Sequence, residues 1–309
     1  MKILILGYSS LCKRKIIPAL KKIFPKVKFC ISSKSQTRQY IGESEWFDSY
    51  EEALKKSNAD LVYISLINSK HYYWAKKFLK NNYHVIVDKP ATLNFKQAKN
   101  LVQIAKRKRK LFSEAVVFQH HHQINKVKQE IKSIKNLDSV EARFAIPKLP
   151  KKNFRNHRKY GGGCLLDMGP YAAAIFRMYI NEDYSKISIQ CFSNYTKGGL
   201  NKSFNILVLT PSKFFTGFFS FNEKYENTLA LCTKRKKVTI NRVFSPPNDQ
   251  NLILQINHGR VKKEKKIKKD DAFLNYFKFI FRTIKRKSFE NSYQNILKDS
   301  FFREKMKKI

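Results

Sequence analysis

The first part of the chain alternates short apolar segments with segments of helical periodicity. Strands are predicted at residues 2–6, 26–32, 60–66, 84–87 and 111–118. Helices are predicted between them, at residues 11–24, 50–56, 71–80 and 94–107. Neighbouring parallel strands need a crossover connection, which is usually a helix. This order therefore predicts an α/β fold, a doubly wound parallel sheet of the Rossmann type with helices on both faces.

Beyond residue 122 the pattern predicts a second kind of domain. A strand is expected at 138–146 and a glycine-led helix near 163–180. Alternating apolar residues then predict strands at 187–195, 203–210, 214–221, 229–233, 237–243 and 252–256. A basic loop follows, then a helix at 271–286 and a last helical segment. We expect a dinucleotide-binding domain over 1–122. Over 123–309 we expect an α+β domain for substrate binding and oligomerisation, with a large, mostly antiparallel open sheet and C-terminal helices that pack back on the first domain.

The first predicted strand leads into the turn GYSSLC, which has one glycine where dinucleotide folds usually have three. Gly7 takes the first glycine position, Ser9 the second and Cys12 the third. A strand, a glycine turn and a helix in succession offer backbone N–H groups and the positive end of a helix dipole to a pyrophosphate. Ser9 and Ser10 add hydroxyl donors. An ordinary strand-to-helix turn of another α/β protein is the alternative.

The end of the second predicted strand bears on the choice of cofactor. NAD sites usually carry an acidic residue about 20 residues beyond the glycines, where it binds the ribose hydroxyls. Here the strand ends in Ser32, Ser33, Lys34 and then Arg38, with no carboxylate among them. Hydroxyl and cationic side chains suit a 2′-phosphate, which favours NADP over NAD. A solvated loop in a lysine-rich protein is the alternative.

Two later segments resemble the Gfo/Idh/MocA family of nicotinamide-dependent oxidoreductases. That family has a P-N-x-x-H turn after its fourth strand and Glu-Lys-Pro at the end of its fifth. Asn68 and His71 match the turn, with Ile67 in place of its proline, and residues 88–90 read Asp-Lys-Pro. Residues 114–123 are similar to the family's E-A-x-x-x-R-x-H-P-Q segment, with Gln119 in place of its arginine and histidine in place of its proline.

The strongest resemblance lies in residues 153–171, NFRNHRKYGGGCLLDMGPY. They are similar to the family's F-R…G-G-G-x-L-x-D-x-G-x-(H/Y) element, whose aspartate and final histidine or tyrosine face the substrate. Tyrosine at the final position favours the sugar and nucleotide-sugar ketoreductase branch of the family. The motifs occur in the family's order over nearly the whole chain, so the resemblance implies the family's fold and an NAD(P)-dependent sugar dehydrogenase or ketoreductase activity.

The resemblance also assigns roles to residues. It implies hydride transfer between nicotinamide and a sugar carbon. In reduction, Tyr171 protonates the developing alkoxide and Lys89 stabilises it. Asp167 orients a sugar hydroxyl, Arg155 holds an anionic part of the substrate and His121 lines the cleft. The cofactor site comprises Gly7, Ser9, Ser10, Leu11, Ser32, Ser33, Lys34, Arg38, Ser65, Leu66, Asn68, His71 and Asp88.

Local geometry is compatible with these roles and with plainer ones. Asp167 and Tyr171 are four residues apart and share one helix face. Pro170 fits the first turn of that helix if Asp167 is its N-cap. Lys89 precedes a proline, so it should be extended and project beyond the strand end, where ligands bind in such sheets. A solvated lysine, a capping aspartate and a packed tyrosine are the plainer alternatives.

The sequence does not predict a metal site. His120, His121 and His122 are consecutive, and consecutive residues of a strand point to opposite faces, so three imidazoles should not converge. No carboxylate or cysteine ligand is near them in sequence. The five cysteines are scattered and include no CxxC pair, so neither disulfides nor zinc are expected.

The formal charge of +40 favours anionic partners, yet it is spread along the whole chain. The densest basic runs lack the interleaved aromatic residues that stack nucleic-acid bases. No apolar run approaches the ~20 residues of a membrane span, and no secretory signal is recognisable. We therefore expect a cytoplasmic homo-oligomer, a dimer or tetramer, that acts on a sugar or nucleotide-sugar of surface-polysaccharide or modified-sugar biosynthesis, without nucleic acid. A catalytically weakened homologue that binds nucleotide or sugar as a regulatory partner is the alternative.

Overall fold

The structure, a computed structural model, describes residues 1–34 and 44–307 and forms two compact units. The first unit comprises Met1–Ala115 and Phe273–Leu297, and the second comprises Val116–Ala272 and Lys298–Ile309. The chain therefore passes from the first unit to the second, returns to the first and ends in the second. Whether independently folding domains divide after residue 122 stays a prediction.

The first unit is built on a parallel sheet of six strands in the order β3-β2-β1-β4-β5-β6. Its strands are β1 (Lys2–Leu6), β2 (Lys28–Ser32), β3 (Glu45–Phe47), β4 (Leu61–Ile64), β5 (His84–Asp88) and β6 (Phe112–Ala115). Strands β1, β4 and β5 are almost entirely buried, as expected for a parallel sheet covered on both faces. The order reverses at β1, which has β2 on one side and β4 on the other, and this is where such sheets bind ligands. The predicted Rossmann-type sheet is confirmed.

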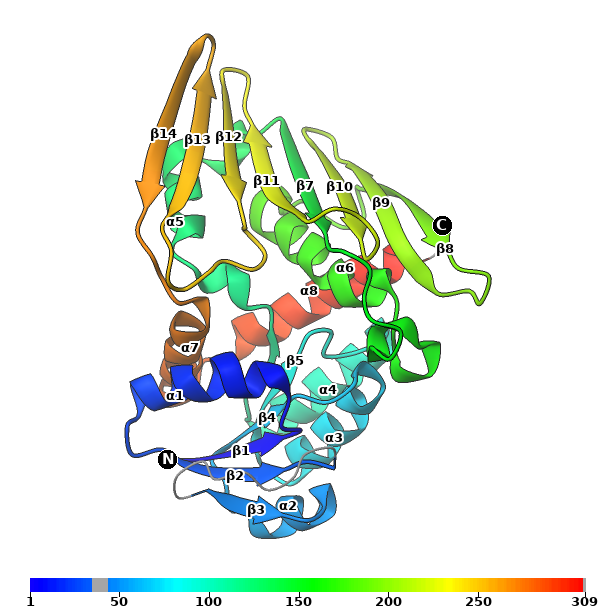
Figure 1. The fold of residues 1–309 in the computed structure, drawn as a ribbon, viewed down its shortest axis with the longest axis vertical. Helices are drawn as coiled ribbons and strands as arrows, with labels where there is room; N and C mark the ends of the chain where they lie inside the picture. The colour runs from blue at the N-terminus through cyan, green and yellow to red at the C-terminus, as the bar shows by residue number, and fades with distance from the viewer. Residues whose placement is uncertain (35–43, 308–309) are drawn as a thin grey trace. The chain divides into compact units, whose positions relative to one another are not determined.

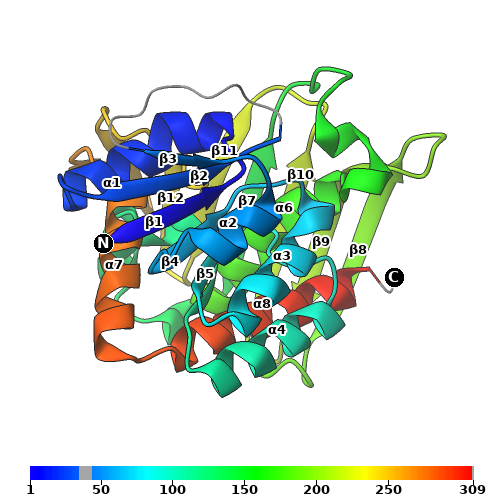
Figure 2. The same ribbon diagram turned by 90° about the horizontal axis from the view of Figure 1, so that it is seen from below.

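Helices cover both faces of this sheet (Figures 1 and 2). They are the π-helical turn η1 (Cys12–Ile16), α1 (Ile17–Ile23), α2 (Tyr50–Lys56), α3 (Asn68–Lys80), α4 (Phe95–Lys108), α7 (Ala272–Arg286) and the first half of α8 (Glu290–Met306). On one face the ring of Phe24, directly after α1, meets that of Phe281 in α7, and Tyr63 of β4 lies against Phe277. Helix α7 thus completes the layer that α1 begins.

The second unit is built on an open sheet of eight strands in the order β14-β13-β12-β11-β7-β10-β9-β8. Its strands are β7 (Ser139–Ala145), β8 (Ser188–Tyr195), β9 (Asn201–Leu209), β10 (Phe214–Ser220), β11 (Glu226–Cys232), β12 (Lys236–Asn241), β13 (Leu252–His258) and β14 (Val261–Ile267). All pairs are antiparallel except β7 with β10. Helices α5 (Gln123–Ile131) and α6 (Cys164–Ile175) cover one face, as Figure 1 shows, and the core lies between them and the sheet. The predicted mostly antiparallel sheet is confirmed.

Four local expectations were wrong. The basic segment expected as a loop forms strand β14, and a short strand, β3, was not expected. Strand β6 ends at Ala115, and a 3-10 turn, η2 (Val117–His120), follows it. Helix α6 begins at Cys164 after the N-cap Gly163, so Asp167 lies within the helix instead of capping it. No described helix is long and apolar enough to cross a membrane.

Candidate functional site

The glycine turn lies at the carboxyl end of β1, between β1 and the start of η1. Gly7 has a positive φ of 92°, and a Cβ there would collide with the carbonyl oxygen of Ser65. Its N–H donates to the Ser32 carbonyl at 2.8 Å. Glycine is therefore required at this position, and the chain has kept it. The turn fits a dinucleotide, because its glycine presents bare backbone at the point where the strand order of the sheet reverses.

The other two glycine positions hold side chains that the turn accommodates. Cys12 is completely buried, and its Sγ lies 3.5 Å from the Gly7 carbonyl oxygen. Burial raises the pKa of this thiol to about 11, so it is a packing group rather than a nucleophile. Ser9 Oγ accepts the Cys12 backbone N–H at 3.2 Å, which closes the first turn of the helix.

A chain of hydroxyl groups joins three strand ends beside this turn. Ser9 Oγ lies 2.8 Å from Ser65 Oγ, after β4, and Ser65 Oγ donates to Asp88 Oδ2 at 2.5 Å, in β5. The Tyr63 hydroxyl donates to the other Asp88 oxygen. Burial and the Asp88 charge raise the pKa of Tyr63 well above its ordinary value, so it remains a donor. Asp88 therefore binds the predicted residue Ser65 directly and is linked through it to the predicted residue Ser9.

The other predicted cofactor residues lie around the same sheet edge. Ser32, buried, ends β2, and Ser33 and Lys34 follow it, with the Lys34 ammonium 5.4 Å from the Tyr50 ring centroid. Arg38 lies outside the described residues. Arg14 Nε donates to Ser10 Oγ at 3.1 Å, so that hydroxyl is engaged on the helix surface. Leu11 precedes η1, and Leu66 and Asn68 bracket the start of α3.

Three glycines shape the segment that carries Arg155 in the second unit. Gly161 and Gly163 have positive φ angles of 75° and 106°, and a Cβ on Gly162 would collide with the Arg155 carbonyl oxygen. That oxygen accepts the Gly163 N–H at 2.9 Å. The chain therefore folds back tightly on itself just before α6. Arg155 Nε donates to Asp167 Oδ1 at 2.8 Å, an ion pair in which the aspartate is buried.

Tyr171 follows Asp167 by one helical turn, so the two lie on one face of α6. Its ring is half-buried among Phe118, Phe144 and Phe244, with ring centroids 5.3 to 5.8 Å away. Edge-on and tilted contacts of this kind fix the ring plane. The structure thus brings together three predicted residues, Arg155, Asp167 and Tyr171, at the first half of one helix. Lys89 belongs to the first unit, at the end of β5.

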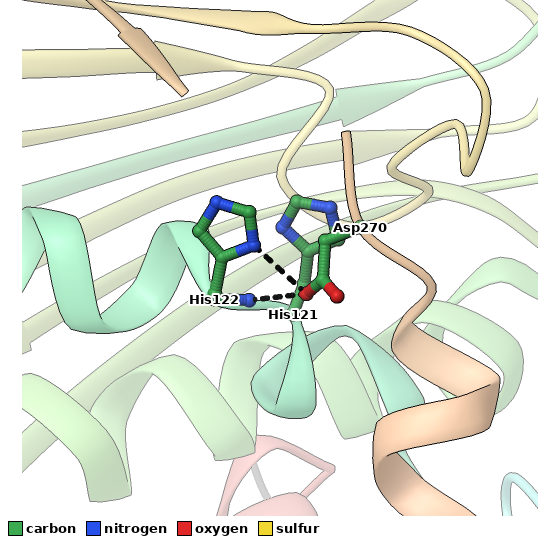
Figure 3. Close-up of side chains that lie close together, drawn as sticks. All are labelled: His121, His122 and Asp270. Atoms are coloured by element: carbon green, nitrogen blue, oxygen red, sulfur yellow. Dashed lines mark hydrogen bonds and ion pairs between the residues drawn. The ribbon is translucent and has the colours of Figure 1, made fainter. Parts of the chain in front are cut away.

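His121 hydrogen-bonds and stacks with residues outside that group. Its Nδ1 accepts the Gln123 N–H at 3.2 Å, and its ring stacks on that of His122. Asp270 Oδ2 accepts the His122 backbone N–H at 2.8 Å and lies 3.0 Å from His122 Nδ1 (Figure 3). The premise of alternating faces was wrong, because these histidines follow a 3-10 turn and a distant carboxylate joins them.

The nitrogen and oxygen atoms of His121, His122 and Asp270 lie within 4.8 Å of one another. An imidazole binds a metal in its ring plane, at about 2.0–2.1 Å. The two ring planes are inclined by only 14°, with centroids 5.1 Å apart, and His121 Nδ1 already accepts the Gln123 N–H. As it stands, the cluster is a contact between His122 and Asp270 with the His121 ring stacked beside it. That the chain has no metal site stays a prediction.

Several contributing residues were not found from the sequence. Tyr63 and Glu114 lie at strand ends, where the position rule for parallel sheets could have singled them out. Phe118, Phe144 and Phe244 come from three separate segments. No sequence signal joins them, since aromatic residues are ordinary core residues.

Comparison with known proteins follows the same division of the chain. The family described as "Oxidoreductase family, NAD-binding Rossmann fold" matches residues 1–116, and the "GFO/IDH/MocA C-terminal domain" matches residues 127–238. A dTDP-3,4-didehydro-2,6-dideoxy-alpha-D-glucose 3-reductase of Saccharopolyspora spinosa is 26% identical, over 88% of this chain and 83% of its own length. One of the same name from Actinomadura kijaniata is 25% identical, over 82% and 78%.

Solved structures show the same fold. KijD10, a 3-ketoreductase from Actinomadura kijaniata in complex with NADP and TDP-benzene, superposes with a TM-score of 0.88 at 21% identity, covering 97% of this chain and 94% of that one. An aldose-aldose oxidoreductase from Caulobacter crescentus reaches a TM-score of 0.85 at 14% identity, covering 99% and 96%.

Proposed function

Because the chain belongs to the Gfo/Idh/MocA oxidoreductase family, we propose that it is an NADP-dependent reductase or dehydrogenase of a nucleotide-sugar. The observation that carries the proposal is that Asp167 and Tyr171 share one face of α6 and that Arg155, from the glycine-folded segment before the helix, pairs with Asp167. The relatives named as dTDP-sugar 3-reductases, which match over most of the chain, support this substrate class. The proposed reaction belongs to modified-sugar or surface-polysaccharide biosynthesis.

Bound NADP(H) supplies the hydride chemistry. The chain binds it at the Gly7 turn, with Ser32, Ser33 and Lys34 at the adenosine phosphate. Tyr171 donates the proton to the sugar oxygen in reduction and takes it back in oxidation. Lys89 stabilises charge on that oxygen. Asp167 accepts a hydrogen bond from a sugar hydroxyl, while the guanidinium of Arg155, which holds Asp167 in place, binds an anionic part of the substrate.

Two further features belong to the proposal. We expect a homo-oligomer, a dimer or tetramer. We also expect a cytoplasmic location, which cell fractionation would check. All five cysteines are free thiols, which fits a reducing compartment.

Titration with NADPH and NADH, followed by nicotinamide fluorescence, tests the proposal first. We expect both to bind, with NADPH the tighter. A chain that binds neither would instead be the weakened homologue, and the enzyme proposal would be lost.

Substitutions test the residue roles. Lys89→Ala and Tyr171→Phe should each lower kcat by about 10²–10⁴-fold, the usual contribution of a general acid or a charge-stabilising group, and leave NADPH affinity nearly unchanged. Lys96→Ala on α4 and Tyr195→Phe on β8 are matched controls, because both side chains are exposed. Wild-type rates in the first pair would remove the assignment.

A further inference from the structure

His71 occupies an environment that restricts its protonation. It lies on α3, and its side chain is completely buried. Its Nδ1 lies 2.8 Å from the Pro90 carbonyl oxygen, and its Nε2 lies 2.9 Å from the Leu66 carbonyl oxygen. Carbonyl oxygens only accept hydrogen bonds, whereas a neutral imidazole has one N–H and one lone pair. Both contacts are hydrogen bonds at once only when both ring nitrogens carry protons.

The peptide group that His71 contacts is held from its other side by a carboxylate. Pro90 supplies the carbonyl to His71, and the N–H of the same peptide group, on Ala91, donates to Glu114 Oε1 at 2.8 Å. Glu114 is buried in β6. A cation beside the carbonyl oxygen and an anion beside the N–H both interact favourably with the dipole of the peptide group. Hydrogen bonds to charged groups are stronger than those between neutral groups. This opposed carboxylate offsets part of the cost of burying a cation.

These contacts anchor the turn that carries Lys89. Asp88 is bound by Tyr63 and Ser65, the Pro90 carbonyl by His71, and the Ala91 N–H by Glu114. The bond from His71 to Leu66 ties the same turn to the end of β4, next to Ser65. Asp88, Pro90 and Ala91 are thus each held by a neighbouring segment, which leaves the Lys89 backbone between them little freedom to move.

We propose that His71 is a buried imidazolium that positions Lys89, by donating from both ring nitrogens to the segments that follow β4 and β5. The positioning role rests on the proposed function, because it needs Lys89 to act on the substrate. The protonation does not. Two other histidines show the opposite arrangement: His84 and His121 each accept a backbone N–H at Nδ1, from Leu111 and Gln123, and must be unprotonated there.

Nitrogen NMR of the full chain labelled with ¹⁵N-histidine tests the protonation directly. The seven histidines are assigned from single substitutions, including His71→Gln and His84→Asn. At pH 7 we expect both ring nitrogens of His71 to give the chemical shifts of protonated imidazolium nitrogens. His84, in the same spectrum, should show one protonated and one unprotonated nitrogen. If His71 gives the pattern of His84, the proposal is overturned.

Kinetics at saturating NADPH test the positioning. His71→Gln removes one of the two donors and should lower kcat by about 10–100-fold, the effect expected of a displacement of ~1 Å at a reacting group, with KM for the sugar little changed. Glu114→Gln should lower kcat less, because it keeps an acceptor. His84→Asn is the control and should retain wild-type kcat. Normal turnover by folded His71→Gln would refute positioning. A wild-type chain without turnover would refute the proposed function, and the NMR result would still decide the protonation.

Discussion

At the scale of single residues, the three glycine positions of the nucleotide turn have separate steric requirements. Gly7 is the position of the three at which both the backbone conformation and the available space exclude a side chain. Its φ is positive, and the Ser65 carbonyl oxygen lies where a Cβ would be. The third position concerns packing between helix and strand, and the buried Cys12 fills it without displacing the turn. The loss of two glycines therefore leaves the shape of the turn intact.

His84 gives a residue-scale prediction about acid stability. Burial, followed by the charge of Lys110, lowers its pKa from the usual 6.5 to about 4. Between these values the unfolded chain binds a proton that the folded chain does not, so the free energy of unfolding should fall as the pH drops from 6.5 towards 4. Above pH 6.5 this contribution is complete and constant.

His84→Asn should remove that pH dependence while keeping an acceptor for the Leu111 N–H. Because the ring is only partly buried, we expect the wild-type and variant curves to differ by about 1 kcal/mol over this window. Urea denaturation at a series of pH values measures the difference. Parallel curves from pH 7 to 4 would show that His84 does not carry it.

At the scale of elements, periodicity predicted what is buried and missed what is exposed. Strands β1 and β5 have apolar, buried centres, so their positions were predicted to within one residue, as was α2 at Tyr50–Lys56. Strand β14, with the sequence VKKEKKI, is exposed over six of its seven positions at the sheet edge, so it has no apolar alternation to detect. Its lysines suit an edge strand, since charge there opposes pairing with other chains.

The candidate site shows the same division. Resemblance located Asp167, Arg155 and Asp88, but their partners could not be predicted from the sequence. Arg155 meets Asp167 only because three glycines fold the chain back, and His71 binds backbone carbonyls, which carry no sequence signature. Contacts between distant segments depend on the folded backbone, which a motif does not describe.

The uncovered face of the second sheet gives an element-scale prediction. Phe192, Leu209, Phe214 and Ile253 are 64%, 46%, 44% and 50% exposed, and Leu209 is directly opposite Phe214 across β9 and β10. Exposed apolar side chains on an open sheet face favour contact with another protein surface, and we propose a second copy of the chain. Replacing both Phe192 and Phe214 by Glu should convert the proposed homo-oligomer to a monomer of 36.4 kDa in sedimentation experiments.

Tyr73→Glu is the control for that experiment, because Tyr73 is 49% exposed on α3 in the first unit. It should leave the oligomer intact. A wild-type chain that is monomeric at micromolar concentration, or a double variant that stays assembled, would exclude this face as the interface.

At the scale of the whole molecule, a net charge of +40 acts on any anionic substrate. A field of this sign raises the rate at which anions arrive and is screened as the Debye length falls from ~10 Å at 0.1 M to ~3 Å at 1 M salt. At saturating NADPH, kcat/KM for a nucleotide-sugar should therefore fall several-fold with rising salt while kcat stays constant. A neutral sugar turned over by the same enzyme should show little salt dependence.

Two triple variants of equal charge separate a local field from the general one. Lys148, Lys151 and Lys152 lie in the segment that leads to Arg155, whereas Lys262, Lys263 and Lys265 lie on the edge strand β14. Each triple change of lysine to glutamine removes three positive charges. Because screening confines each charge to about one Debye length, the first triple should lower kcat/KM at low salt more than the second. Equal losses of kcat/KM in the two triple variants would mean that the net charge attracts the substrate and that the position of the lysines does not matter. The absence of any salt effect on kcat/KM would contradict an anionic substrate.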